Sequence, residues 1–151
     1  MKRLIYIIIS ITFLLQSCDK MPTDSRLDGM WQLISIERAE GTTDTKPQRI
    51  YWCFRRELVQ YTSDGGEILF SHVSHRGDSL LFRDFFHDSK SAVEGDDNQP
   101  VLPSEAPLLH GYGVWACTGN GALSASFHID RLSSDRLVLR NDSSVITFRK
   151  F

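Results

Sequence analysis

Two histidines three residues apart, His72 and His75 in "SHVSH", are the first side chains whose type and spacing could bind a metal ion. A strand places residues i and i+3 on opposite faces, so one ion could not easily take both rings. Zinc would also need a third or fourth ligand. We expect strand-end histidines exposed to solvent and no metal site.

Motifs of the common enzyme classes are missing from the sequence. It contains no G-x-S-x-G, no H-E-x-x-H, no Walker-type loop and no Cys-x-x-Cys. Acidic residues are frequent in predicted turns, but none form the paired carboxylates on one face that glycoside hydrolysis needs. The sequence therefore predicts a protein that is not an enzyme and that uses no cofactor.

Cys18 has the most specific surroundings of the three cysteines. Two basic residues, Lys2 and Arg3, precede the apolar run "LIYIIISITFLLQS", which ends directly before it. This run is shorter than the roughly 20 residues that a membrane-spanning helix needs. A basic start, a short apolar run and a small residue before the cleavage point are typical of a secretory signal peptide. We predict that residues 1–17 are this peptide.

The context Leu15-Gln16-Ser17-Cys18 resembles the bacterial lipobox, although Gln16 departs from the small or aliphatic residue usual at its position. The resemblance implies cleavage before Cys18, lipidation of its sulfur and acylation of the new amino group. It implies a protein anchored to the membrane of the bacterial cell envelope, in the outer membrane rather than the inner. The alternative is an ordinary signal peptide with Cys18 as a free thiol. Residues 18–28 are polar and are predicted to form a tether.

A lipidated Cys18 leaves Cys53 and Cys117, in "YWCF" and "VWAC". In an oxidising compartment two such cysteines can form a disulfide. Free cysteines are also common as small buried apolar residues. Both interpretations stay open, because the sequence does not give the distance between the two sulfurs.

From Met30 onward, alternating apolar and polar residues are broken by turn residues, which favours short strands over helices. Short links between neighbouring strands favour an up-and-down meander, and eight strands can close into a small barrel. We therefore predict an all-β domain over residues 29–151, an eight-stranded antiparallel up-and-down barrel. The predicted strands are 30–37, 49–62, 67–75, 80–87, 108–117, 123–130, 136–140 and 145–151.

Aromatic residues on the predicted inner faces could line a ligand cavity or fill the barrel, and we favour a filled core. They are Trp52, Phe54, Phe82, Trp115 and Phe127. Two charges, Arg56 and Asp84, also fall on these apolar faces, where an unpaired charge is costly. Three interpretations remain: a bulge or mouth position that exposes Arg56, an internal pair between the two residues, or a contact from Arg56 to an anionic ligand.

Gly29-Met30-Trp31 resembles the Gly-x-Trp motif on the first strand of lipocalins, although the same triplet recurs at Gly113-Val114-Trp115. The resemblance implies that Trp31 closes one end of the barrel. It also implies that an arginine of the last strand, here Arg149, packs across that tryptophan. Residues 29–151 as a whole resemble the lipocalin-like lipoproteins of Bacteroidetes.

This resemblance implies the binding or transport of a small apolar molecule at the cell envelope. The alternative is a non-catalytic interaction module with a solid core, whose loops bind an envelope protein or a glycan. The net charge of -2 gives no support to a nucleic-acid partner, because nucleic-acid binders normally carry a basic stripe.

Overall fold

The computed structural model describes residues 25–87 and 99–151. The predicted signal peptide and Cys18 lie outside this range. In the two described segments, no helix has the length and apolar character needed to cross a bilayer. The elements are β1 (Gly29–Arg38), β2 (Gly41–Asp44), η1 (Lys46–Gln48), β3 (Tyr51–Arg55), β4 (Leu58–Thr62), β5 (Leu69–Arg76), β6 (Ser79–His87), η2 (Pro103–Glu105), α2 (Ala106–His110), β7 (Cys117–Gly119), β8 (Ala122–Leu132), β9 (Arg136–Arg140) and β10 (Val145–Lys150).

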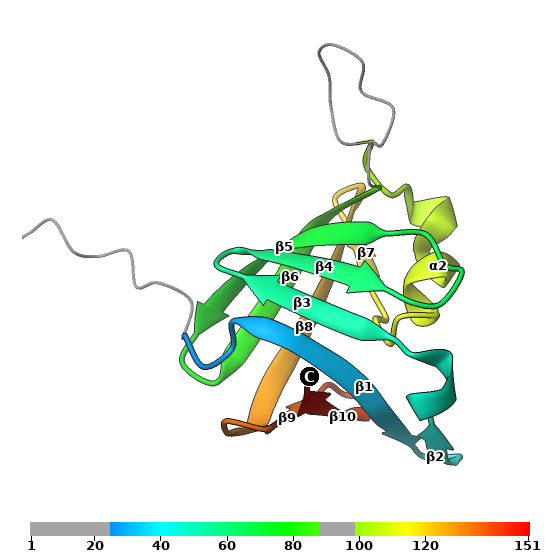
Figure 1. The fold of residues 1–151 in the computed structure, drawn as a ribbon. Helices are drawn as coiled ribbons and strands as arrows, with labels where there is room; N and C mark the ends of the chain where they lie inside the picture. Colours follow the sequence, from blue (N-terminus) through cyan, green and yellow to red (C-terminus); the bar gives the residue numbers. More distant parts are fainter. Residues whose placement is uncertain (1–24, 88–98) are drawn as a thin grey trace, which may run out of the picture.

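The strands form one antiparallel barrel (Figure 1). Eight strands follow each other around it in the order β1, β3, β4, β5, β6, β8, β9 and β10, and β10 pairs with β1 to close the circle. The short strands β2 and β7 lie against β1 and β8. The predicted eight-stranded up-and-down barrel is confirmed.

The barrel has two distinct ends. The start of β1, the end of β10 and the turns β3–β4, β5–β6 and β8–β9 lie at one end, which we call the closed end. The opposite end, the mouth, carries β2, the turn β4–β5, α2 and the turn β9–β10. Figure 1 shows α2 at the upper right and β2 at the lower right, both away from the point on the left where the described chain begins.

Two of the predicted strands are wrong, and the errors cancel in the count. The predicted strand 49–62 is a hairpin, because Arg55 pairs with Leu58 and Arg56 adopts a left-handed turn conformation with φ of 57°. The predicted strand 108–117 forms α2 and a turn, and only Cys117 enters a strand. Pro107 in the first turn of α2 and Gly113 at φ of 82° favour this path over an extended chain.

A β-bulge in β6 changes which side chains face inward. Phe70 pairs with Phe86 and His72 with Arg83, so Ser71 lies opposite two residues, Asp84 and Phe85. Asp84 takes a left-handed conformation with φ of 53°. The bulge turns Phe85 into the core and leaves Asp84 exposed, whereas the sequence predicted Asp84 on the inner face.

The folded unit begins before the predicted boundary at residue 29. Leu27, assigned to the tether, is fully buried in the hydrophobic core. Its carbonyl oxygen accepts a hydrogen bond of 2.8 Å from the indole Nε1 of Trp31. The residues just before β1 are therefore part of the barrel's closed end.

Candidate functional site

Trp31 is fully buried at the closed end of the barrel. The cation that packs against its ring is Lys150, whose Nζ lies 5.0 Å from the ring centroid. Arg149, the residue expected there, instead donates to Gln32 Oε1 at 3.0 Å. The prediction was wrong by one residue, because Lys150 and not Arg149 is the register partner of Trp31. Gly29 leaves space for the Lys150 side chain, since a Cβ there would lie 3.0 Å from Cε.

The centre of the barrel is filled by aromatic rings. Five rings surround Trp52 with centroid distances from 4.8 to 6.2 Å, in the range of favourable ring contacts: Phe54, Tyr61, Phe82, Phe127 and Phe148. Four of the predicted cavity-lining residues, Trp52, Phe54, Phe82 and Phe127, thus meet in one packed cluster.

The end of α2 and the segment after it insert into the mouth and cover this cluster. Leu109, Tyr112 and Val114 are buried. The carbonyl oxygen of Tyr112 accepts a hydrogen bond of 2.8 Å from Trp52 Nε1, and the Tyr112 hydroxyl donates to the Glu67 carbonyl. The centre of the barrel is therefore connected by a direct hydrogen bond to the segment that closes its mouth.

A cleft opens on the flank of the barrel where β6 and β8 separate. The two strands pair only as far as Arg83 and Ser124. Beyond this point β6 pairs with the chain around Pro100, and β8 pairs with β7. The wedge between them has a volume of about 370 Å³ and is lined mainly by apolar side chains: Phe85, Phe86, Pro100, Val101, Leu102, Pro103, Ala122 and Leu123.

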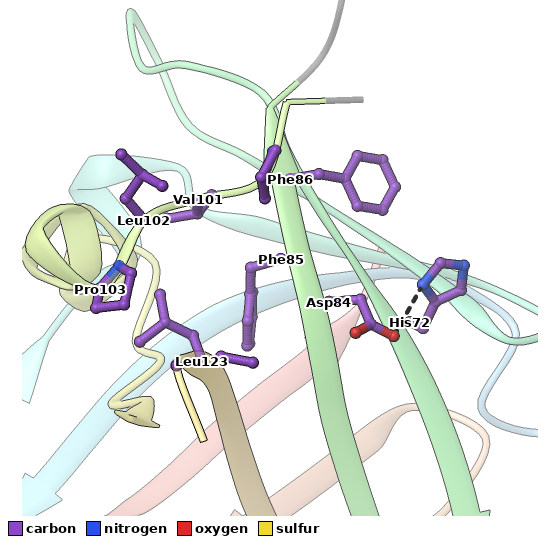
Figure 2. Close-up of a pocket in the computed structure, with 11 residues that line it drawn as sticks. His72, Asp84, Phe85, Phe86, Val101, Leu102, Pro103 and Leu123 are labelled. Carbon is purple, nitrogen blue, oxygen red and sulfur yellow. Dashed lines mark ion pairs between the residues drawn. The ribbon is translucent and has the colours of Figure 1, made fainter. Parts of the chain in front are cut away.

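The polar groups of the cleft lie at its rim. Phe85 points to the side of β6 that faces Leu123, and Asp84 points to the other side, toward His72 on β5 (Figure 2). His72 Nδ1 lies 3.7 Å from Asp84 Oδ2, and Arg83 Nε lies 4.0 Å from the same oxygen. The cleft therefore combines an apolar floor with a small charged edge.

A network of side chains holds the outer wall of the cleft in place. Glu105 accepts a hydrogen bond of 2.9 Å from the Leu102 N–H. This bond, together with His87, lowers the pKa of the Glu105 carboxyl. His87 Nε2 lies 3.5 Å from Glu105 and its Nδ1 lies 3.4 Å from Glu67. His87 thus links the wall to the barrel through the two carboxylates.

The remaining predicted site residues lie elsewhere. Arg56 is exposed in the β3–β4 turn at the closed end, so it forms no internal pair with Asp84. Trp115 lies outside the barrel and is half-buried. Arg38 Cζ lies 3.8 Å from the centroid of its ring, and the centroid of the His110 ring lies 5.8 Å away. Cys53 and Cys117 are both free thiols, and burial raises the pKa of the Cys53 thiol.

Sequence reasoning missed most of the cleft. Residues 101–103, "VLP", are an apolar stretch between the predicted strands 80–87 and 108–117, where we predicted no element. Phe85-Phe86 is a second overlooked signal, because strict alternation can bury only one of two adjacent phenylalanines. A bulge lets Phe85 enter the core while Phe86 stays half-buried beside the cleft.

The closed eight-stranded antiparallel barrel, with a buried tryptophan on its first strand, is a small β-barrel of the lipocalin type. The model of the lipocalin-like domain family matches residues 13–151, and the chain belongs to that family. A crystal structure of a lipocalin-like protein from Bacteroides uniformis is similar, with a TM-score of 0.55 and 20% identity over 83% of this chain and 99% of that one.

An uncharacterised protein from Bacteroides eggerthii, also a crystal structure, gives a TM-score of 0.55 and 19% identity over 82% of this chain and 98% of that chain. At these identities both structures support the fold alone. No curated protein matches the chain.

Proposed function

We propose that this protein is a non-catalytic, lipid-anchored protein of the cell envelope that binds a small, largely apolar molecule in the cleft between β6 and β8. The observation that carries the proposal is the cleft itself. Its volume of about 370 Å³ falls within the range of ligand pockets, which are mostly apolar with a few polar groups. The packed rings around Trp52 support the flank rather than the barrel centre as the place where a ligand binds.

Two exposed leucines near the cleft provide a matched test. Leu102 lines the cleft and is 53% exposed, whereas Leu108 on α2 is 44% exposed and does not line it. Leu102→Asp should weaken binding of the neutral apolar dye N-phenylnaphthylamine about tenfold, or about 1.4 kcal/mol, because a ligand would lose apolar contact area. Leu108→Asp should leave the dissociation constant unchanged. Equal effects from both substitutions in fluorescence titrations would exclude the cleft as the site.

Cys18 provides the test of the anchor. Cys18→Ala removes the sulfur that a lipid would modify, and we expect the protein to leave the membrane fraction. A single acyl chain holds a protein to a membrane only weakly. Stable anchoring therefore needs both the lipid on the Cys18 sulfur and the acyl group on its amino group. The measurement is the partition of the protein between membrane and soluble fractions of its host. Ser17→Ala keeps Cys18 and a small residue before it, and should leave the protein membrane-bound, whereas a Cys18→Ala protein that stays in the membrane fraction would refute the anchor.

The filled barrel centre favours a second candidate function, an interaction module whose loops bind an envelope protein or a glycan. Native mass spectrometry of the protein purified from its host separates the two. A co-purified apolar molecule that is lost in Leu102→Asp supports the cleft, and a protein or glycan adduct that persists in this variant supports the alternative.

A further inference from the structure

The closed end of the barrel carries an excess of basic side chains. The basic residues come from the start of β1, the end of β10 and the three turns at this end: Arg26, Arg55, Arg56, Arg76, Arg131, Arg136, Arg149 and Lys150. All but Lys150 are exposed. The acidic residues at the same end are fewer: Asp28, Glu57, Asp78 and Asp135. Asp130 lies nearby, but Arg140 holds its carboxylate in two hydrogen bonds from Nε and one from Nη2.

The mouth carries the opposite charge. Among the described residues there, the acidic side chains are Glu37, Glu40, Asp44, Asp64, Glu67, Glu105 and Asp142, and the basic ones are Arg38, Lys46 and Arg49. A net charge of -2 for the whole chain therefore conceals a separation of charge along the barrel axis.

The described chain begins at the basic end. Ser25, its first residue, begins the turn that carries Leu27 and leads into β1. Figure 1 shows the blue start of the described ribbon beside the β3–β4 turn. Six residues lie between Cys18 and Ser25, and the seven Cα-to-Cα steps that join the two residues span at most about 25 Å when extended. A lipid on Cys18 would therefore keep the basic end within a short distance of the bilayer.

We propose that the closed end is a docking surface for an anionic lipid bilayer, and that docking orients the barrel with its mouth and cleft away from the membrane. The proposal rests on the lipid anchor of the proposed function. Anionic membrane surfaces attract nearby Lys and Arg side chains over a Debye length, which is about 8 Å at physiological salt. The acidic mouth would be repelled from the same surface, so both ends favour one orientation.

The contact is electrostatic and spread over the surface rather than built around one lipid headgroup. A second, separate hollow of about 320 Å³ lies at this end and is lined by Arg26 and Arg131, but also by Asp78 and Asp130. Side chains of both signs give it no preference for an anion. The whole set of basic residues, rather than one pocket, carries the interaction.

The test uses the full-length lipidated protein, reconstituted through its anchor into vesicles that contain a nitroxide-labelled lipid as quencher. A fluorophore is attached at the closed end through Ser134→Cys in a Cys117→Ser background, or near the mouth through native Cys117. Cys53→Ser is present in both proteins. With phosphatidylglycerol in the vesicles, the label at residue 134 should be quenched much more strongly than with phosphatidylcholine alone. The label at Cys117 should stay unquenched in both.

Charge reversal supplies the control. Arg76→Glu with Arg136→Glu should lower the ratio of docked to undocked protein more than about tenfold, since each basic group near an anionic surface contributes about fivefold. Lys46→Glu with Arg49→Glu makes the same change of charge at the mouth and should not reduce docking. Salt of about 1 M, where the Debye length is about 3 Å, should abolish the difference between the two vesicle types.

Flotation of the vesicles on a density gradient shows whether the protein is anchored. Protein that floats with the vesicles but shows equal quenching at both labels would overturn the docking surface and leave the anchor intact. Selective quenching that survives charge reversal or high salt would overturn its electrostatic basis. Protein that floats with neither vesicle type would refute the anchor, and the docking surface with it.

Discussion

Trp52→Ala should lower the free energy of unfolding by about 4 kcal/mol, measured by urea denaturation. Truncation of a buried tryptophan typically costs 3–5 kcal/mol, because a cavity remains where the ring was. Here a second cost adds to that of the cavity. The substitution also removes the indole N–H that donates to the buried Tyr112 carbonyl at 2.8 Å, and an unsatisfied buried acceptor is costly.

Trp115→Ala is the matched control, because the sequence placed both Trp115 and Trp52 on inner faces of predicted strands. It lies half-buried outside the barrel, between Arg38 and His110. We expect a smaller loss of about 1–2 kcal/mol, from one cation–π contact and from the apolar contact of a ring that is only partly buried against the core. Losses of similar size from both substitutions would contradict the packed cluster around Trp52 and favour a barrel with an open centre.

Trp52→Phe divides the first effect into its two parts. It keeps an aromatic ring inside the barrel, so the cavity is much smaller than with alanine, and it removes the hydrogen bond to Tyr112. We expect a smaller loss than with alanine, together with faster hydrogen exchange in the segment around Leu109 and Val114, which this bond holds in the mouth. Unchanged exchange there would show that the segment is held by packing alone.

The sequence predicts the barrel well because strand alternation and short turns are local signals. In β8 the buried residues Leu123, Ala125 and Phe127 alternate with more exposed ones, as predicted. The eight-strand closure follows from the number of such segments. The alternation of apolar and polar residues cannot show where a β-bulge adds one residue to a strand. One extra residue at Asp84 moved this carboxylate to the rim of the cleft and brought Phe85 into the core.

The cleft results from that bulge and from the separation of β6 and β8, which pair with other segments beyond it. The alternation of apolar and polar residues predicts neither feature. β6 pairs with residues near Pro100 because Val101 N–H donates to the Phe85 carbonyl at 2.8 Å. β8 takes β7 as its partner instead. The first pairing joins β6 to a segment beyond residue 98, whereas the second is a tight hairpin between neighbouring strands. Together they leave the wedge that Phe85 and Leu123 line.

The two Gly-x-Trp triplets show how one motif performs two tasks. At Gly29 the missing Cβ leaves room for the flexible Lys150 side chain to reach Trp31. At Gly113 the missing Cβ leaves room for Leu33, and the tryptophan that follows, Trp115, lies outside the barrel. The spacing alone therefore does not distinguish a barrel-closing tryptophan from a surface one.

Gly113→Ala should lower the free energy of unfolding by about 2–3 kcal/mol. Its φ of +82° strains any residue with a side chain. In addition, the new Cβ would lie 3.2 Å from Leu33 Cδ2 in the core, and overpacking has its own cost. Gly65→Ala separates the two causes, because Gly65 has a similar φ of +72° with no atom within 4 Å of the added Cβ.

Gly65→Ala should therefore cost only the backbone strain, about 1 kcal/mol. The difference between the two variants in urea denaturation measures how tightly the segment after α2 fits into the mouth. If Gly113→Ala costs no more than Gly65→Ala, that segment yields easily and does not seal the barrel. The packed centre would then be open to a ligand from the mouth, and the flank cleft would lose its priority as the binding site.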